Sequence, residues 1–511
     1  MLLSGAALPF YQLEFPVECA TPEAAAAAEL TLLPLPEGKK VAFSCRWDDS
    51  HERNLNMREV MAKYGVKGTF YLHDTQRKNF WKNVFPALHK DGFTIGNHTR
   101  SHRELALQTP NAIFFDILWW NMVLEHRSNQ AVTGFVVPYS KVASPFFPGV
   151  PKLVGSLLRR AGMLGGADFQ PDMYKLFGSE KGEYSGTRML VPGAVNTSIP
   201  AFEKQLAAHL KAQPEYPHVT MGIHALHSDE NLLVIGEIFK KYSGRADWWY
   251  CNENEFIAYS TLLHNCRISG KRTDGKTAYF TLTLPRPELL GSDVSLWGKC
   301  NGKIFPIPHR KQLPELIGLT DKNGRTAKFP GLNASVKTAG DKICFSVRNS
   351  GAALENVLLT LRLPPAFETE KIFVELKRID REYFAEWTVR RRTGLDLSGR
   401  ELCAVQMDFV RDGKAGRLWS WELKEHPAKA LPYQLYFSKE EMSLADAVKL
   451  STAAAVPAGF TAGRQENFLR NGVVRLIIPG RKNAKSGFTA VMEFEGGKKF
   501  ELKGHLPAKI I

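Results

Sequence analysis

Short apolar segments alternate with helix-like segments through the first half of the chain. Residues 41–45 (VAFSC) and 68–72 (GTFYL) are apolar runs typical of buried strands, and residues 57–65 (MREVMAKYG) between them predict a helix that ends at a glycine. A second predicted helix, residues 80–92, leads into the apolar run FTIGN. This order over residues 39–264 predicts parallel strands covered by helices, with functional residues on loops beyond the carboxyl ends of the strands.

After about residue 265 the pattern changes to an alternation of apolar and polar residues that is typical of strands. The clearest runs, bounded by Gly, Pro or Asn, are residues 278–285, 341–351, 355–365 and 404–413. Such runs, with few helical patterns between them, predict an all-β, sandwich-like region. We therefore expect an N-terminal extension (1–38), an α/β region (39–264), a β-rich extension (265–335) and a sandwich-like region (336–511) of one or two modules.

Three further segments qualify this picture. The Ala-rich residues 21–30 predict a small helix, and residues 438–455 are the one clear helix candidate in the second half. Trp419 and Trp421 are two residues apart and therefore lie on one face of a predicted strand. They could form a platform for sugar stacking, but we expect them to face the core.

Length and composition restrict the class of protein. A chain of 511 residues exceeds the size of a single core, and 44% hydrophobic with 23% charged residues is typical of a globular protein. No apolar run reaches the roughly 18 residues that a membrane-spanning helix needs. No Lys or Arg precedes Lys39, so we expect no cleaved secretory signal. The seven scattered cysteines contain no CxxC, which favours buried free thiols and a cytoplasmic location, while an extracytoplasmic one stays open.

The net charge of +15 is unevenly distributed along the chain. Residues 1–264 carry 26 basic and 26 acidic residues, whereas residues 265–511 carry 41 and 26. The whole excess lies in the second half. A basic region attracts polyanions such as acidic polysaccharides, although a Lys-rich solvated surface explains the same composition.

Chemically active residues follow three predicted strands of the first half. Asp48 and Asp49 follow the first strand, His98 and His102 follow a later one, and His224 ends a strand near residue 224. Two imidazoles and one carboxylate are a recurring ligand set for a divalent catalytic metal, and a second carboxylate beside them can act as a base. Each feature alone is common in polar turns. Their combination in this order predicts a metal site.

These residues resemble the polysaccharide deacetylase family, whose catalytic unit is called the NodB-homology domain. RWDDS matches the family's aromatic-Asp-Asp motif, HTRSH matches H-[ST]-x-x-H, and KGTFYL and MGIH fit their contexts. The resemblance covers roughly residues 39–259. It implies an α/β fold, a distorted (β/α) barrel, which an all-β region follows in this chain. It also implies that Asp49, His98 and His102 bind a divalent ion, with zinc expected and cobalt, nickel or iron compatible.

The resemblance also implies catalytic roles. Asp48 acts as general base towards water, His224 protonates the leaving amine or alcohol, and the backbone N–H of Tyr139 stabilises the oxyanion. Two departures affect these roles and leave the metal ligands untouched. Val136 stands where the family has an Arg that orients the base, and the family's Asp-Trp motif has only weak counterparts, Asp168 and Asp172.

Several neighbouring residues keep alternative interpretations. His51, His73 and His227 are either additional ligands, substrate contacts or ordinary structural residues, and we expect the last. Arg46 and Trp47 either shape a substrate cleft or pack under the first strand.

The sequence thus predicts a metal-dependent hydrolase that removes N- or O-acetyl groups from a carbohydrate. The basic second half would position a polymeric substrate, including an anionic one. The alternatives are C–N hydrolysis of a small cyclic amide and a catalytically decayed glycan-binding protein, which the Val136 departure favours. Nucleic-acid binding is not expected because no RNP-like, zinc-finger or helix-turn-helix pattern is present. The sugar, its linkage and the oligomeric state are left open.

Overall fold

The structure is a computed structural model in which the chain forms two compact units. The first comprises residues 1–106, 114–391 and 402–422, and the second comprises residues 107–113, 392–401 and 423–511. The described residues are 9–105, 108–140, 150–166, 187–189, 195–212, 218–222, 224, 229–308, 313–392, 397, 399–426, 435–438, 460–463, 475–478, 488–493 and 499–504. Asp168, Asp172, His227 and all but the first residue of the helix predicted over 438–455 lie outside them.

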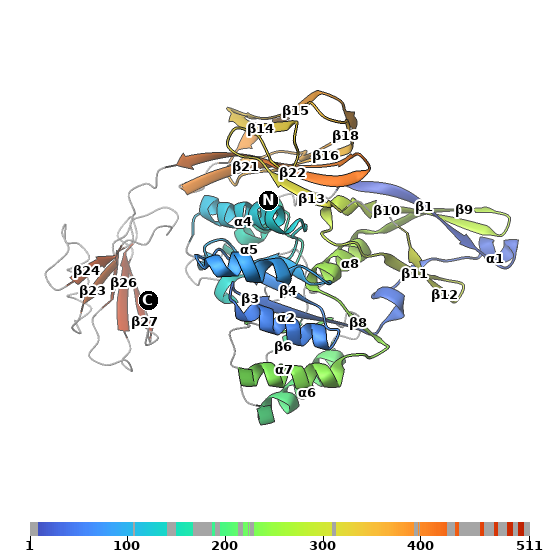
Figure 1. Ribbon diagram of the computed structural model, residues 1–511, viewed down its shortest axis with the longest axis horizontal. Coiled ribbons are helices and arrows are strands. Elements are labelled where there is room, and N and C mark those ends of the chain that lie inside the picture. The colour runs from blue at the N-terminus through green and yellow to red at the C-terminus, as the bar shows by residue number, and fades with distance from the viewer. Residues whose placement is uncertain are drawn as a thin grey trace. The chain divides into compact units, whose positions relative to one another are not determined.

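A parallel sheet forms the centre of the first half, in the strand order β5-β4-β3-β7-β6, with β8 also paired to β3 (Figure 1). Its strands are β3 (Val41–Asp48), β4 (Gly68–Leu72), β5 (Thr94–Asn97), β6 (Thr187–Met189), β7 (His218–Met221) and β8 (Trp248–Tyr250). All of these pairs are parallel. The predicted strand and helix alternation is confirmed, while closure into a barrel stays a prediction.

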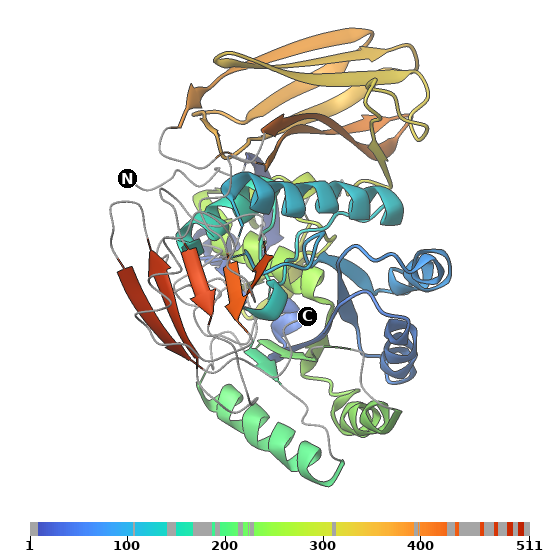
Figure 2. The ribbon, with the colours of Figure 1, turned by 90° about the vertical axis from the view of Figure 1, so that its left-hand side faces the viewer.

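Helices surround this sheet, so its central strand is buried along its whole length (Figure 2). The helices are α2 (Arg53–Lys63), α4 (Pro110–Ser128), α5 (Val150–Ala161), α6 (Val195–Ala212), α7 (Asp229–Tyr242) and α8 (Glu253–Asn265). The helix predicted over residues 80–92 is shorter. A π-helical turn, η2 (Phe80–Val84), precedes α3 (Phe85–Leu88), because Pro86 has no N–H for a continuous helix.

The strands of the N-terminal segment pair with strands of the β-rich extension. Strand β1 (Phe10–Glu18) pairs antiparallel with β10 (Thr277–Pro285), which pairs with β9 (Arg267–Asp274). Strand β2 (Thr31–Leu32) pairs with β11 (Leu296–Cys300), the partner of β12 (Lys303–Ile307). The predicted small helix is α1 (Pro22–Ala26). Apolar residues of these strands, α1 and α8 form one buried cluster.

Two further sheets form the β half of the first unit, and they lie over one another in Figure 2. One has the order β13-β22-β21-β16-β18, and the other has the order β14-β15-β19. Their strands are β13 (Leu316–Leu319), β14 (Leu332–Ala339), β15 (Lys342–Asn349), β16 (Leu354–Arg362), β18 (Phe373–Ile379), β19 (Glu382–Thr388), β21 (Gly399–Arg411) and β22 (Lys414–His426). The short strands β17 (Phe367–Glu368) and β20 (Arg390–Arg391) pair separately. The predicted β-rich texture is confirmed.

Of the two tryptophans of β22, Trp419 lies in the core, as expected, with 1% exposure. Its indole donates to Glu125 at 2.7 Å. Trp421 is half-buried, donates to the Thr320 carbonyl at 2.8 Å and packs edge-on against Trp119. Trp419 is therefore not a surface platform for sugars.

A buried ion network centred on Arg417 joins β22 to helix α4. The guanidinium of Arg417 contacts Asp408 at 2.7 Å and Glu125 at 3.0 Å, and it donates to the carbonyl of Glu288. Burial lowers the pKa of Arg417, but Asp408 and Glu125 raise it more, so the net shift is upward. This network fixes the β half to the sheet that carries the candidate site.

The second unit contains a five-stranded sheet in the order β24-β23-β25-β26-β27. Its strands are β23 (Leu435–Ser438), β24 (Phe460–Gly463), β25 (Arg475–Ile478), β26 (Phe488–Glu493) and β27 (Lys499–Gly504). All seven cysteines of the chain are free thiols. Four of them are buried, as predicted, whereas Cys19, Cys266 and Cys344 are partly exposed. Among the described helices, none is both long and apolar enough to cross a bilayer.

Candidate metal and catalytic site

The predicted site residues meet at the carboxyl ends of the parallel strands. Asp48 is the last residue of β3 and Asp49 follows it, while His98 directly follows β5. His224 lies beside Asp48, to which it forms a parallel bridge beyond β7. Parallel strands end at one edge of their sheet, so residues far apart in the chain converge there.

The Asp49 carboxylate is the centre of this cluster. Its Oδ1 lies 3.1 Å from Nε2 of His102 and 3.6 Å from Nε2 of His98, and its Oδ2 lies 3.6 Å from Nε2 of His224. The Nε2 atoms of His98 and His102 are 3.1 Å apart. The ligand atoms of Asp49, His98 and His102 all fall within 4.8 Å of one another.

Hydrogen bonds to β5 and α4 shape the loop that carries the two histidines. The Asn97 side chain accepts from the N–H of Thr99 and donates to a carbonyl of α4. Asp116 of α4 accepts from the N–H and the hydroxyl of Ser101 at 3.0 and 2.7 Å. Thr99 and His102 both have positive φ, a strained conformation that is typical of functional loops. The loop is therefore built to hold one arrangement of imidazoles.

The protonation states of His98 and Asp49 favour the binding of a cation. Nδ1 of His98 is 2.9 Å from the Val136 carbonyl and must carry the proton, which leaves a lone pair on Nε2. Burial lowers the pKa of His98 to about 4. Burial raises the pKa of Asp49, but contact with His102 and the charges of His98 and His224 lower it more, so the net shift is downward. At neutral pH both groups are in the deprotonated form that metal ligands require.

An unsatisfied oxygen supports the same interpretation. Oδ1 of Asp49 is buried and makes no well-oriented hydrogen bond within the described part of the chain. A buried carboxylate oxygen is costly without a partner, and Nε2 of His102 and Nε2 of His98 lie 3.1 and 3.6 Å from it. The residues present therefore fit a divalent ion.

The Asp48 carboxylate is paired with Arg46, a residue whose role the sequence left open. Arg46 donates to the Asp48 carboxylate through Nε at 3.1 Å and Nη2 at 2.5 Å. Both side chains are almost completely buried, with 0% and 6% exposure. Residues two apart in a strand share a face, and this spacing is the signal in the sequence that identifies the pair. Trp47, on the opposite face, packs in the core and donates to the sulfur of Met61.

The carboxylate of Glu253 is also buried and lies close enough to Arg46 and Asp48 to feel their charges, which no pattern in the sequence indicated. Glu253, at the start of α8, accepts hydrogen bonds from Tyr71 and, at 2.6 Å, from Thr220. Burial raises the pKa of Glu253, against the lowering effect of Arg46 and of these hydrogen bonds. Only the tertiary fold brings residue 253 next to residues 46 and 71.

The remaining candidates occupy distinct positions. Tyr139 has a φ of +59° and a 60% exposed side chain, and its ring centroid is 4.8 Å from that of His102. Val136 is buried, its N–H donates to the Asn97 carbonyl at 3.0 Å, and its carbonyl accepts from Nδ1 of His98. His73 lies in the site, with Nε2 at 3.6 Å from Asp49. His51 instead accepts the N–H of Arg53 at the start of α2, a structural role.

Comparisons with solved structures find similarity at low identity. The catalytic domain of a peptidoglycan N-acetylglucosamine deacetylase from Eubacterium rectale is 18% identical, with 41% of this chain and 87% of that chain covered and a TM-score of 0.30. Peptidoglycan deacetylase PdaC from Bacillus subtilis is 14% identical, with 43% and 92% covered and a TM-score of 0.29. A family 4 acetyl xylan esterase from Clostridium thermocellum is 15% identical, with 42% and 90% covered and a TM-score of 0.28.

No curated protein matches the chain. The family model described as polysaccharide deacetylase matches residues 37–152. This range includes Asp48, Asp49, His98 and His102 and ends before His224. The match confirms the predicted resemblance of this part of the chain to the polysaccharide deacetylase family.

Proposed function

We propose that this protein is a metal-dependent hydrolase that removes acetyl groups from a carbohydrate. One observation carries the proposal: Asp49, His98 and His102 converge within 4.8 Å, with Asp48 beside them, inside the range that matches the polysaccharide deacetylase family. Asp49, His98 and His102 would hold the ion. Nitrogen and oxygen ligands of this kind suit zinc, and also cobalt, nickel or iron.

When bound, a divalent ion polarises an acyl carbonyl and makes water a stronger nucleophile at neutral pH. Asp48 is proposed to accept the proton of the attacking water, because its carboxylate is near enough to raise the pKa of His98 but does not belong to the group of three ligand residues. His224, on the other side of Asp49, would donate a proton to the leaving amine or alcohol. The backbone N–H of Tyr139 would donate to the oxyanion, a role that needs no particular side chain at position 136.

Arg46 supports this assignment because it supplies a cation that the Val136 position lacks. We propose that Arg46 fixes the Asp48 carboxylate through its two hydrogen bonds, in place of the family's arginine at position 136. The replacement explains how a chain with Val136 retains an oriented base. It also counts against catalytic decay.

Moving the arginine from position 46 to position 136 tests this role of Arg46. Arg46→Met is expected to lower kcat by about 10- to 100-fold with metal content and KM unchanged, because partners that orient site residues contribute effects of this size. Adding Val136→Arg to Arg46→Met is expected to restore part of the loss, since position 136 is where the family has the arginine that orients the base. Val136→Arg alone is the matched control. Equal kcat in wild type and Arg46→Met would refute the positioning role.

Metal removal tests the proposed function. Treatment with a chelator is expected to abolish acetate release from acetylated chitooligosaccharides or acetylated xylan, and one equivalent of Zn²⁺ should restore it. The His98→Ala, His102→Ala double variant is expected to bind no ion by elemental analysis. Ion binding without acetate release from either substrate, but with hydrolysis of a cyclic imide, would support the C–N hydrolase alternative and contradict the proposal.

A further inference from the structure

One row of polar side chains crosses the outward face of the β14-β15-β19 sheet. Arg325, on the loop before β14, forms an antiparallel bridge with Asn333 of β14. Asn333 is opposite Arg348 of β15, and Arg348 is opposite Glu382 of β19. Directly opposed residues point to the same face of a sheet, and all four are exposed. The row therefore places an amide between two guanidiniums, with about 10 Å between the outer strands that carry them.

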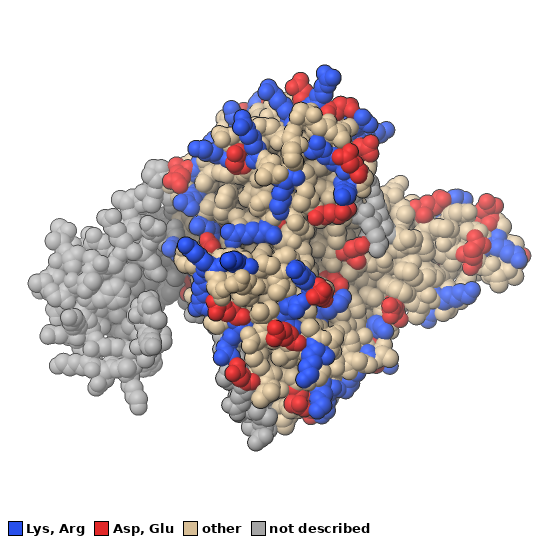
Figure 3. All heavy atoms as spheres, viewed as in Figure 1, with Lys and Arg blue, Asp and Glu red and all other residues tan. Residues whose placement is uncertain are grey.

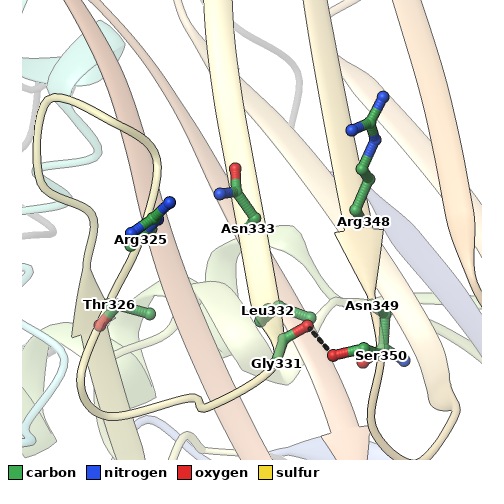
Figure 4. A pocket seen from close by; sticks show the side chains of 8 residues that line it. All are labelled: Arg325, Thr326, Gly331, Leu332, Asn333, Arg348, Asn349 and Ser350. Carbon is green, nitrogen blue, oxygen red and sulfur yellow. Dashed lines mark hydrogen bonds between the residues drawn. The ribbon is translucent and has the colours of Figure 1, made fainter.

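A surface cavity of about 460 Å³ opens at this row, and Arg325, Asn333 and Arg348 line it (Figure 4). The turn between β13 and β14 closes one end, where Ser350 donates to the Gly331 carbonyl at 3.2 Å. No carboxylate lines the cavity. Within the described residues, neither guanidinium forms an ion pair closer than 4 Å. Two exposed guanidiniums that form no salt bridge within the described residues, in a cavity lined by polar side chains, indicate a site for an anion, although Glu382 is opposite Arg348 and Asp321 is near Arg325.

The next row of the same face adds an apolar surface. Ser335, Ser346 and Phe384 are opposite one another on β14, β15 and β19. The two serine hydroxyls are hydrogen-bonded at 2.9 Å. Phe384 is 58% exposed, which is unusual for a large apolar residue on a strand. Its ring lies diagonal to Arg348, within the reach of a ligand that contacts both rows.

We propose that this face binds an acidic polysaccharide whose sugar rings carry carboxylates. Arg325 and Arg348 would each pair with a carboxylate, because the planar guanidinium matches a carboxylate in a bidentate way. Asn333 and the serines would bond to hydroxyls, and Phe384 would contact the apolar face of a sugar ring. The proposal rests on the proposed function for the choice of a glycan as ligand. It assigns to one site part of the positive charge of residues 265–511.

Acidic side chains near Arg325 and Arg348 restrict the predicted attraction for an anion to this row. On the face shown in Figure 3, basic and acidic side chains are interspersed over the β half, so the argument concerns this row and not a broad basic surface. The Asp321 carboxylate accepts the N–H groups of Asn323 and Arg325 and belongs to the turn. Glu382, at the end of the row, opposes an anionic ligand. Its removal should therefore strengthen binding.

Titration calorimetry with oligomeric polygalacturonate on the full chain tests the proposal. This polymer bears carboxylates and no acetyl group, so its binding is independent of turnover. Arg325→Gln with Arg348→Gln is expected to weaken binding at least about tenfold, because charge-assisted hydrogen bonds are lost. The matched control, Arg267→Gln with Lys303→Gln, removes two exposed cations of β9 and β12 and is expected to change affinity by less than about twofold.

Three single variants refine the test. Glu382→Gln is expected to tighten binding, and Phe384→Ala to weaken it, whereas Phe384→Trp should retain it. An equal loss in both double variants would overturn the site, since the effect would then be one of net charge. Equal binding of a neutral glucan, or stronger binding of dextran sulfate with the same dependence on Arg325 and Arg348, would overturn the carboxylate assignment. Lack of metal-dependent acetate release with intact polygalacturonate binding would refute only the proposed function.

Discussion

Asp48→Asn is expected to lower the rate of acetate release by about 100- to 10,000-fold, the usual contribution of a general base. The amide oxygen at position 48 can still accept a hydrogen bond from Arg46, so the buried guanidinium keeps a partner. The ligand atoms of Asp49, His98 and His102 are unchanged, so the metal content should stay that of the wild type. Steady-state kinetics with elemental analysis measures both quantities.

The neighbouring residue provides the matched control. Asp49→Asn makes the same chemical change one position later, but it removes the carboxylate that the imidazoles surround. This variant should lose both the ion and the activity. If Asp48→Asn instead loses the ion, or keeps the activity of the wild type, the assignment of base and ligand to positions 48 and 49 is wrong.

Arg417→Met is expected to lower the free energy of unfolding of the first unit by about 3–5 kcal/mol, because it leaves buried carboxylates without their cation. Asp408 and Glu125 are buried, and both contact Arg417. Urea denaturation, followed by tryptophan fluorescence, measures the change, since Trp419 is hydrogen-bonded to the same Glu125.

Two comparisons identify the cause. Arg378→Met removes an arginine whose pairs with Asp380 and Glu355 are exposed, and it should change the unfolding midpoint little. Adding Asp408→Asn and Glu125→Gln to Arg417→Met should recover part of the lost stability, because the unpaired charges are then removed. If the triple variant is as unstable as Arg417→Met, lost packing and not charge is responsible.

The parallel sheet and the convergence of Asp49, His98 and His102 were predictable because both depend on local patterns. Apolar runs with helical segments between them indicate where the strands lie in the sequence. Because parallel strands end at one edge of their sheet, the residues that follow them share that edge. Asp49, His98 and His102 therefore converge as the sequence predicts. The interpretation of Trp419 as core was also confirmed, whereas Trp421, on the same face of the strand, is only half-buried.

Contacts that depend on tertiary packing could not be predicted from local patterns in the sequence. Glu253 reaches the neighbourhood of Tyr71 only through the packing of α8 against the sheet. His73 was expected to be structural, but the turn after β4 places it beside Asp49. The row formed by Arg325, Asn333 and Arg348 depends on strand register, which alternation alone does not specify.

The pairing of β1 with β10 has a consequence for the order of folding. Phe10 is opposite Pro285, and Glu18 is opposite Thr277, so the two partner strands enclose the whole α/β region between them in the chain. During synthesis, β1 stays unpaired until the residues of the parallel sheet and then residues 277–285 have left the ribosome. Such long-range pairing slows folding, because the entropy cost of closing the loop is met before the strand contacts form. We therefore expect β1 to join its sheet only after the whole α/β region has been synthesised.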